Sequence, residues 1–188
     1  MRLVVGISGT SGVVYGIRFL QELRAKGIET YLVVSRAAEK LMAYETGMGL
    51  EDVEGLATQR YGVDDMFAPI ASGSNPTDGM AVIPCSMKTL AGIACGYAEN
   101  LMLRAAMVTL KEGRRLVLVP RETPLSPVDL GNMLRLSRIG VTILPAMPAF
   151  YHSPRSIDDL VAYVVGKTLD AFRIEHDLFK RWGGLQQK

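Results

Sequence analysis

A short polar loop that follows an apolar segment is the first feature of this sequence that could do chemistry. It lies within the decapeptide MAVIPCSMKT, residues 80–89. We expect Pro84 to end a strand here and a helix to begin at Met87, which leaves the backbone N–H groups of Cys85 and Ser86 free. The N-terminus of such a helix carries the positive end of the helix dipole and binds anions. The junction therefore predicts an anion-binding site.

The two cysteines and two histidines of the chain limit its redox and metal chemistry. A thiol at the edge of a loop, such as Cys85, could act as a nucleophile, but no histidine stands beside it in the sequence, which favours a packing or loop role. Cys85 and Cys95 provide no disulfide framework and fit a reducing compartment. With only His152 and His176, and without a C-x-x-C motif, the sequence predicts no metal site.

Length and composition indicate a folded protein without extreme charge. The chain has 188 residues, of which 48% are hydrophobic, so we expect one domain with a substantial core. A formal net charge of +2 gives no reason to expect a nucleic-acid partner. The apolar start, residues 1–7, is too short for a signal peptide, and the sequence shows no apolar run long enough to span a membrane. We therefore expect a cytoplasmic protein without a membrane partner.

Short apolar segments alternate with longer helical patterns along the chain. The expected strands cover residues 3–7, 30–34, 80–83, 115–119 and 141–144. The expected helices cover residues 13–26, 37–45, 88–95, 100–112, 127–138 and 157–176. Because the strands are apolar throughout, both of their faces should be buried, as in a parallel sheet. We predict a single α/β domain over residues 1–188, with a doubly wound parallel sheet, helices on both faces, and a C-terminal helix and short tail from about residue 157.

Serine marks the start of two helices, whereas one long segment has no regular pattern. Ser126 and Ser156 each stand three residues before an aspartate, which is the pattern of a capping box. Residues 48–75 show neither clear strand nor clear helix periodicity. We expect that segment to be irregular or to contact another subunit.

The loops that follow the strands form the expected site, because ligands of open parallel sheets bind beyond the carboxyl ends of the strands. These loops are residues 8–12, 35–36, 84–89, 120–124 and 145–152. They bring glycines, hydroxyl groups, arginines and an aromatic ring to one edge of the sheet. That combination suits a ligand with a phosphate group and a flat ring.

Among phosphate compounds, a mononucleotide such as FMN fits these loops best. The glycines of the first loop do not form the G-x-G-x-x-G fingerprint, and Ser35 stands where an NAD site needs an acid. Arg36 leaves NADP open, because an arginine at this point could bind a 2′-phosphate. The sequence contains no G-x-x-x-x-G-K-[ST] motif, which excludes the Walker type of nucleotide site.

Arg104 and Lys111 form a second group of cations. They are seven residues apart on an expected helix, so they share one face of it. Taken alone, the pair is typical of a solvated surface. The alternative is a second phosphate site, for a small phosphorylated substrate.

Five motifs resemble those of the flavin prenyltransferases, the UbiX-type proteins formerly called aromatic acid decarboxylases. The motifs are G-x-S-G-x-x-Y-G at residues 9–16, TDGM at 77–80 leading into PCSMKT at 84–89, VPRETPL at 119–125, NML at 132–134 and PAFYH at 148–152. The resemblance covers about residues 3–176. It implies the Rossmann-like, flavodoxin-like fold of the HFCD flavoproteins.

The resemblance also implies a reaction. Members of this family bind reduced FMN and dimethylallyl phosphate, and join the dimethylallyl group to N5 and C6 of the flavin. The product, prenylated FMN, serves UbiD-type decarboxylases. No metal takes part, so cations must hold the leaving phosphate. Family members are homododecamers with sites between subunits.

Residue roles are carried over from the family by position. The implied FMN-binding residues are Gly9, Thr10, Ser11, Ser35, Ser86, Met87, Lys88, Thr89 and Arg121. The implied residues for the phosphate of dimethylallyl phosphate are Arg104, Lys111, Tyr151 and Lys167. Ser11, Glu45 and Glu122 are the implied catalytic residues, which handle protons. Some relatives have arginine in place of Lys167, and lysine keeps the charge but loses the bidentate geometry.

Two other functions remain open from the sequence. One is a flavoprotein that decarboxylates its substrate directly, as cysteine-peptide decarboxylases of similar fold do. Those enzymes rely on a histidine after the first helical region, and this chain has none before His152. The other is an FMN-binding accessory subunit of a decarboxylase complex.

Overall fold

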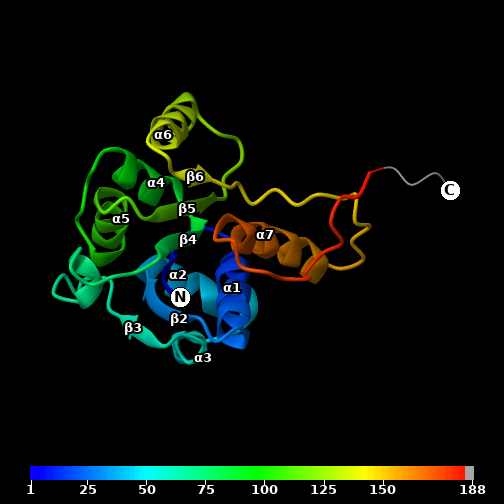
Figure 1. Cartoon of the computed structure of the whole chain (residues 1–188), viewed down its shortest axis with the longest axis horizontal. Coiled ribbons are helices and arrows are strands. Elements are labelled where there is room, and N and C mark those ends of the chain that lie inside the picture. Colours follow the sequence, from blue (N-terminus) through cyan, green and yellow to red (C-terminus); the bar gives the residue numbers. More distant parts are fainter. Residues whose placement is uncertain (185–188) are drawn as a thin grey trace.

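One parallel sheet organises the chain in the computed structural model, which describes residues 1–184 (Figure 1). Its strands are β1 (Arg2–Ile7), β2 (Glu29–Val34), β3 (Gln59–Tyr61), β4 (Gly79–Cys85), β5 (Arg115–Pro120) and β6 (Thr142–Ile143). Neighbouring strands are all parallel, in the order β3-β2-β1-β4-β5-β6. This is the strand order of a Rossmann-type sheet, so the predicted doubly wound α/β fold is confirmed.

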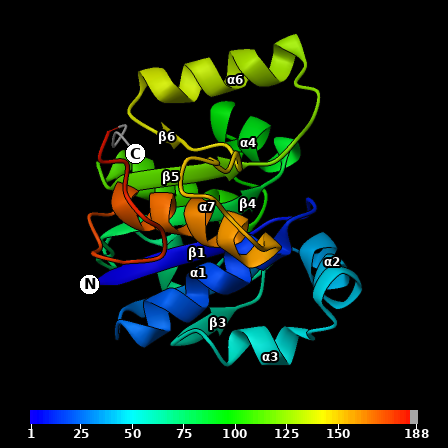
Figure 2. The ribbon, with the colours of Figure 1, turned by 90° about the vertical axis from the view of Figure 1, so that its right-hand side faces the viewer.

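Helices cover both faces of the sheet, as predicted. They are α1 (Val13–Ala25), α2 (Arg36–Thr46), α3 (Leu50–Glu54), α4 (Met87–Ala94), α5 (Leu101–Lys111), α6 (Pro127–Arg138) and α7 (Ile157–Ala171), with a 3₁₀ turn, η1 (Pro69–Ala71). Figures 1 and 2 show α1 and α7 together on one side of the strands, and α4, α5 and α6 on the other. The helix after β1 and the helices after β4 and β5 therefore lie on opposite faces of the sheet, and α7 returns to the face of α1.

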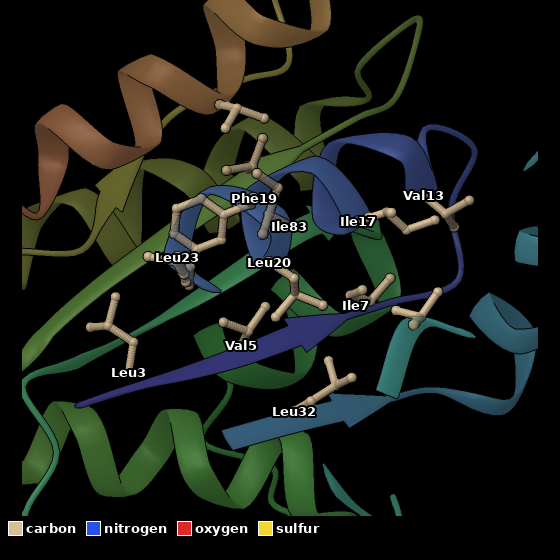
Figure 3. Close-up of a cluster of buried hydrophobic side chains, with 14 of the residues drawn as sticks. Leu3, Val5, Ile7, Val13, Ile17, Phe19, Leu20, Leu23, Leu32 and Ile83 are labelled. Carbon is tan, nitrogen blue, oxygen red and sulfur yellow. The ribbon is translucent and has the colours of Figure 1, made fainter. Parts of the chain in front are cut away.

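The core consists of two apolar layers, one on each face of the sheet. Leu3, Val5 and Ile7 of β1 point into the layer beneath α1 and α7, whereas Val4 points into the layer beneath α4 and α5. Figure 3 shows the first layer, where these three side chains meet Leu20 and its neighbours from α1. Both sets are almost fully buried, which explains why the strands are apolar throughout instead of alternating.

The structure corrects the expected end of the strand at Pro84. β4 continues to Cys85, and the pairing with β5 shifts between Val82 and Cys85, which then pairs with Pro120. A proline has no N–H group for the ladder and is tolerated at such an irregularity. The carbonyl oxygen of Pro84 accepts hydrogen bonds from Ser8 instead, so the strand ends in a contact with the loop after β1.

The segment that looked irregular contains short elements. Residues 48–75 include α3, β3 and η1, which have five, three and three residues. Elements of this length carry too few residues for a periodic pattern, and β3 lies at the edge of the sheet, where only one neighbour pairs with it.

The last helix is shorter than predicted, and its start is as predicted. α7 ends at Ala171 instead of residue 176, because Arg173 adopts a left-handed conformation with φ of 59° and the chain turns back. Ser156 caps its start in a capping box with Asp159, and Ser126 does the same for α6 with Asp129. These boxes confirm the two serine start signals.

We predict that Leu20→Ala lowers the free energy of unfolding by about 2–5 kcal/mol, because it leaves a cavity in the layer beneath α1. Leu20 has no exposed surface, whereas Val14 on the same helix is 37% exposed. Val14→Ala is therefore the matched control, with an expected change within about 0.5 kcal/mol. Chemical denaturation of the two variants measures both values, and equal losses would contradict the assignment of Leu20 to the core.

Candidate functional site

A cavity of about 570 Å³ lies at the carboxyl edge of the sheet, where the sequence placed the site. Its volume is in the range of pockets that hold a cofactor-sized molecule. The lining includes Glu122 and all of the predicted flavin-binding residues except Ser11 and Arg121. The loops after β1, β2 and β4 therefore meet at one cavity. It lies where β1 and β4 pair and lead to helices on opposite faces, the switch point at which such sheets bind ligands.

Three helices point their N-termini at this cavity. The N-cap residues are Ser35 of α2, Ser86 of α4 and Asn100 of α5, and each accepts a hydrogen bond from a backbone N–H group in the first turn, at 3.2, 3.3 and 3.0 Å. All three caps also line the cavity. Because each N-terminus carries a partial positive charge, the cavity favours an anionic group without a buried cation.

Part of the lining could not be read from the sequence. Val63 and Asp64 come from the segment without regular pattern, and Met102 and Leu103 come from the first turn of α5. Asn100 carried a readable signal, because it directly precedes an apolar helix as an N-cap does. Val63 and Asp64 carried none, since a three-residue edge strand places them.

Ser8 fixes the first loop against the third and was missed as a site residue. It is 1% exposed, its Oγ donates to the carbonyl oxygen of Pro84 at 2.9 Å, and the backbone N–H of Ser86 donates to the same Oγ at 2.7 Å. Its hydroxyl therefore uses its donor and one acceptor site between the ends of β1 and β4. Its position as the first residue after a strand was the signal available in the sequence.

Gly9 allows the first loop to approach α2 closely. A Cβ atom at this position would lie 2.4 Å from the Cβ atom of Ala37, a distance that real side chains do not tolerate. A larger residue would push the loop away from α2 and change the shape of the cavity between them.

Arg121 binds the first loop through two of its side-chain nitrogens. Nε donates to the carbonyl oxygen of Ser11 at 3.1 Å, and Nη2 donates to Oγ1 of Thr10 at 3.0 Å. The Thr10 hydroxyl donates in turn to the carbonyl oxygen of Arg121 at 2.9 Å. The guanidinium group thus joins the loops after β1 and β5 and stands beside the cavity.

The three residues predicted to handle protons occupy two positions. Glu122 is on the cavity wall, where its Oε1 accepts from the backbone N–H of Thr123 at 3.1 Å. Glu45 is in the last turn of α2, and its side chain reaches the start of α1, where Oε2 accepts from the N–H groups of Gly12 and Val13 at 2.8 and 3.2 Å. Ser11 directly precedes these N–H groups. Glu45 therefore caps α1, because the N-cap residue Gly12 has no side chain to do so. Glu45 is not among the residues that line the cavity.

The four residues predicted for the second phosphate are not brought together within one chain. Arg104 and Lys111 are on α5, where Nε of Arg104 donates to the carbonyl oxygen of Ala71 at 2.9 Å. Tyr151 and Lys167 lie with α7, on the opposite face of the sheet. A site that contains all four must therefore combine more than one copy of the chain.

Cys85 is the buried one of the two free cysteines. Cys85 is fully buried, and burial raises the pKa of its thiol far above the ordinary range, because the thiolate would lose its hydration. Within residues 1–184 we find no group of three or more His, Cys, Asp or Glu side chains that could hold a metal ion. In the same part of the chain, no helix has the length and apolar character needed to cross a membrane.

Comparison with known proteins gives extensive matches. Residues 1–169 match the family model described as Flavoprotein. The chain is 52% identical over 182 residues to the flavin prenyltransferase UbiX of Thermoplasma acidophilum, an alignment that covers 97% of this chain and 100% of the relative.

Two solved structures are similar over almost the whole chain. One is a dodecameric FMN-dependent UbiX-like decarboxylase from Escherichia coli O157:H7, 52% identical, with a TM-score of 0.96 over 98% of this chain and 100% of that one. The other is AnUbiX (PadA1) in complex with FMN and dimethylallyl pyrophosphate, 48% identical, with a TM-score of 0.97 over 98% of both chains.

We predict that Cys85 in the native protein does not react with iodoacetamide at pH 8, because its thiol is buried and protonated. Mass spectrometry of peptides measures the modification, and the same treatment in denaturant, where Cys85 should be modified completely, is the control. Rapid native modification would show an accessible thiolate and would reopen the nucleophile hypothesis.

Proposed function

The chain belongs to the UbiX-type flavin prenyltransferases of the flavoprotein family, and from this premise we propose that it joins the dimethylallyl group of dimethylallyl phosphate to N5 and C6 of reduced FMN. The product is prenylated FMN. The observation that carries the proposal is the convergence of three capped helix N-termini, at Ser35, Ser86 and Asn100, on one cavity of about 570 Å³. Such a cavity suits the single phosphate of a mononucleotide.

The rest of the lining suits a flat ring next to that phosphate. Apolar side chains of Met87, Met102 and Leu103 line the cavity together with the polar caps. We propose that Gly9, Thr10, Ser11, Ser35, Arg121 and residues 86–89 bind FMN. In this arrangement the helix N-termini hold the phosphate, and Arg121 acts mainly by holding the first loop in place.

We propose that the second substrate binds between copies of the chain in a homododecamer. The placement of Arg104 and Lys111 on one face of the sheet, and of Tyr151 and Lys167 on the other, supports this view, since one chain cannot unite them. A relative 52% identical to this chain is dodecameric. Three cations around a leaving phosphate would stabilise its charge without a metal ion.

Proton handling falls to Ser11, Glu45 and Glu122 in the proposed mechanism. A base must accept a proton as the carbon–nitrogen bond forms, and a carboxylate beside the cavity could do so. Glu122 is the member of this set that lines the cavity. We assign it the direct role, and assign Glu45 the additional task of fixing the start of α1 beside Ser11.

We further propose that a UbiD-type decarboxylase receives the product, as the family resemblance implies, and that this happens in the cytoplasm. The exposed free thiol of Cys95 supports a reducing compartment. The single sheet that contains all described strands supports one flavoprotein domain for the chain.

Anaerobic incubation with reduced FMN and dimethylallyl phosphate, followed by mass spectrometry, tests the proposed reaction. We expect FMN to gain one five-carbon unit. A parallel reaction with dimethylallyl pyrophosphate tests the choice of substrate, and one without protein controls for spontaneous alkylation. Tight FMN binding without any adduct would instead favour the accessory subunit, and carbon dioxide release from a peptide acid would favour the direct decarboxylase.

We predict that Glu122→Gln slows prenylation by about a hundredfold, the usual effect of losing a general base, while the Kd for FMN changes less than about twofold. Single-turnover kinetics and FMN fluorescence titration measure the two effects. Glu51→Gln, the same change in an exposed residue of α3, is the matched control and should leave both unchanged. Equal rates in the Glu122 variant and the unaltered protein would remove Glu122 from the mechanism.

A further inference from the structure

The chain after α7 folds back along that helix and forms a C-terminal strap, which we define as residues 172–184 (Figure 1). The strap packs closely on α7. A Cβ atom at Gly166 would lie 2.6 Å from atoms of both His176 and Phe179, so glycine at this helical position makes the contact possible. The strap is therefore packed against α7 as part of the fold.

Asp170, near the end of α7, anchors the strap. Arg181 donates to both of its carboxylate oxygens, from Nη1 to Oδ2 at 3.1 Å and from Nη2 to Oδ1 at 2.8 Å. His176 lies 3.2 Å from Oδ1, and because its Nδ1 accepts from the N–H of Leu178, its Nε2 carries the proton and donates to Asp170. These bonds, that of Arg181 first, hold the pKa of Asp170 below its ordinary value.

The same carboxylate also attracts Lys167. Its Nζ lies 3.5 Å from Oδ2 of Asp170, three residues further along α7, and its side chain is about half exposed. Arg181 occupies both oxygens with a planar fork, whereas Lys167 reaches one oxygen at longer range. The two cations therefore share one carboxylate, and Arg181 makes the stronger contact with it.

Beyond Arg181, the strap reaches Tyr151. The ring of Trp182 packs edge-on against the ring of Tyr151, with centroids 5.4 Å apart and an interplanar angle of 76°. Tyr163 on α7 packs against Tyr151 from another side, at 6.1 Å. Tyr151 thus lies between α7 and the strap. Arg181, which binds Asp170, directly precedes Trp182 in the chain.

We propose that Arg181 is a positioning residue for phosphate binding: by binding both oxygens of Asp170, it weakens the hold of this carboxylate on Lys167, so that the ligand can attract the ammonium group, and it keeps Trp182 against Tyr151. The inference rests on the proposed function, in which Tyr151 and Lys167 bind the phosphate of dimethylallyl phosphate. Without Arg181, Asp170 attracts Lys167 more strongly than in the present pair at 3.5 Å, and less of the lysine charge is available to the ligand.

The first test is Arg181→Ala in the full chain. We expect the KM for dimethylallyl phosphate to rise about tenfold, while kcat and the Kd for FMN stay within about twofold, because ground-state binding is what is lost. Trp182 is the single tryptophan of the sequence, so its emission reports on the strap and should shift to longer wavelength. Arg138→Ala, an equal change at an exposed arginine of α6, should alter none of these values.

The second test separates competition from mere anchoring. Adding Asp170→Asn to Arg181→Ala removes the carboxylate charge that captures Lys167, so the double variant should recover most of the lost phosphate affinity although the strap stays loose. Asp177→Asn added to Arg181→Ala is the matched control, because Asp177 is an exposed aspartate of the strap, and it should recover none of the lost phosphate affinity. If Arg181 only anchors the strap, the double variant binds phosphate no better than Arg181→Ala, and the proposal is overturned.

A readout without catalysis keeps this proposal distinct from the proposed function. Calorimetric titration with inorganic phosphate should show the same order: weaker binding in Arg181→Ala and recovery in the double variant. If the unaltered protein makes no prenylated FMN but phosphate binding follows this order, the proposed function fails and the role of Arg181 stands. If Arg181→Ala binds phosphate as tightly as the unaltered protein does, the role of Arg181 is wrong, whatever the enzymatic result.

Discussion

The parallel pairing of β1 with β4 is the constraint on which the rest of this structure depends. It places two loops side by side at the carboxyl edge and sends the chain to opposite faces of the sheet, to α1 and to α4. Ser8 completes the pairing, because its hydroxyl bonds both to Pro84 and to the backbone of Ser86. The helix N-termini can converge on a shared cavity because this junction holds the loops between them.

The backbone contributes electrostatic attraction to the cavity, whose lining also includes the cations Arg36 and Lys88. The capped N-termini of α2, α4 and α5 supply partial positive charges that are fixed by the fold. Arg36 in the lining pairs with Asp64, and Arg121 beside the cavity holds the first loop. In the proposed function, these N-termini hold the phosphate of a flavin that later leaves with its new ring.

A second group of cations lies where copies of the chain are proposed to meet. Arg104 and Lys111 project from α5, and Lys167 lies on α7 across the sheet. Each of these cations has a partner within its own chain: Arg104 donates to the carbonyl oxygen of Ala71, Lys111 pairs with Glu112, and Lys167 pairs with Asp170. In the proposed function, the helix N-termini hold the flavin that is modified, and these side chains hold the phosphate that departs.

The sequence by itself determined the features that depend on local or repeated patterns of residues. Apolar strands established a parallel sheet, and serines three residues before an aspartate established two helix starts, since these interactions lie within one strand or one turn. The tertiary structure alone decided that Glu45 caps a helix 32 residues away, that Val63 and Asp64 line the cavity, and that α7 turns back after Ala171. It also separated Arg104 and Lys111 from Tyr151 and Lys167. Contacts between distant segments depend on which face of the sheet each segment packs against, and no spacing within one segment records that choice.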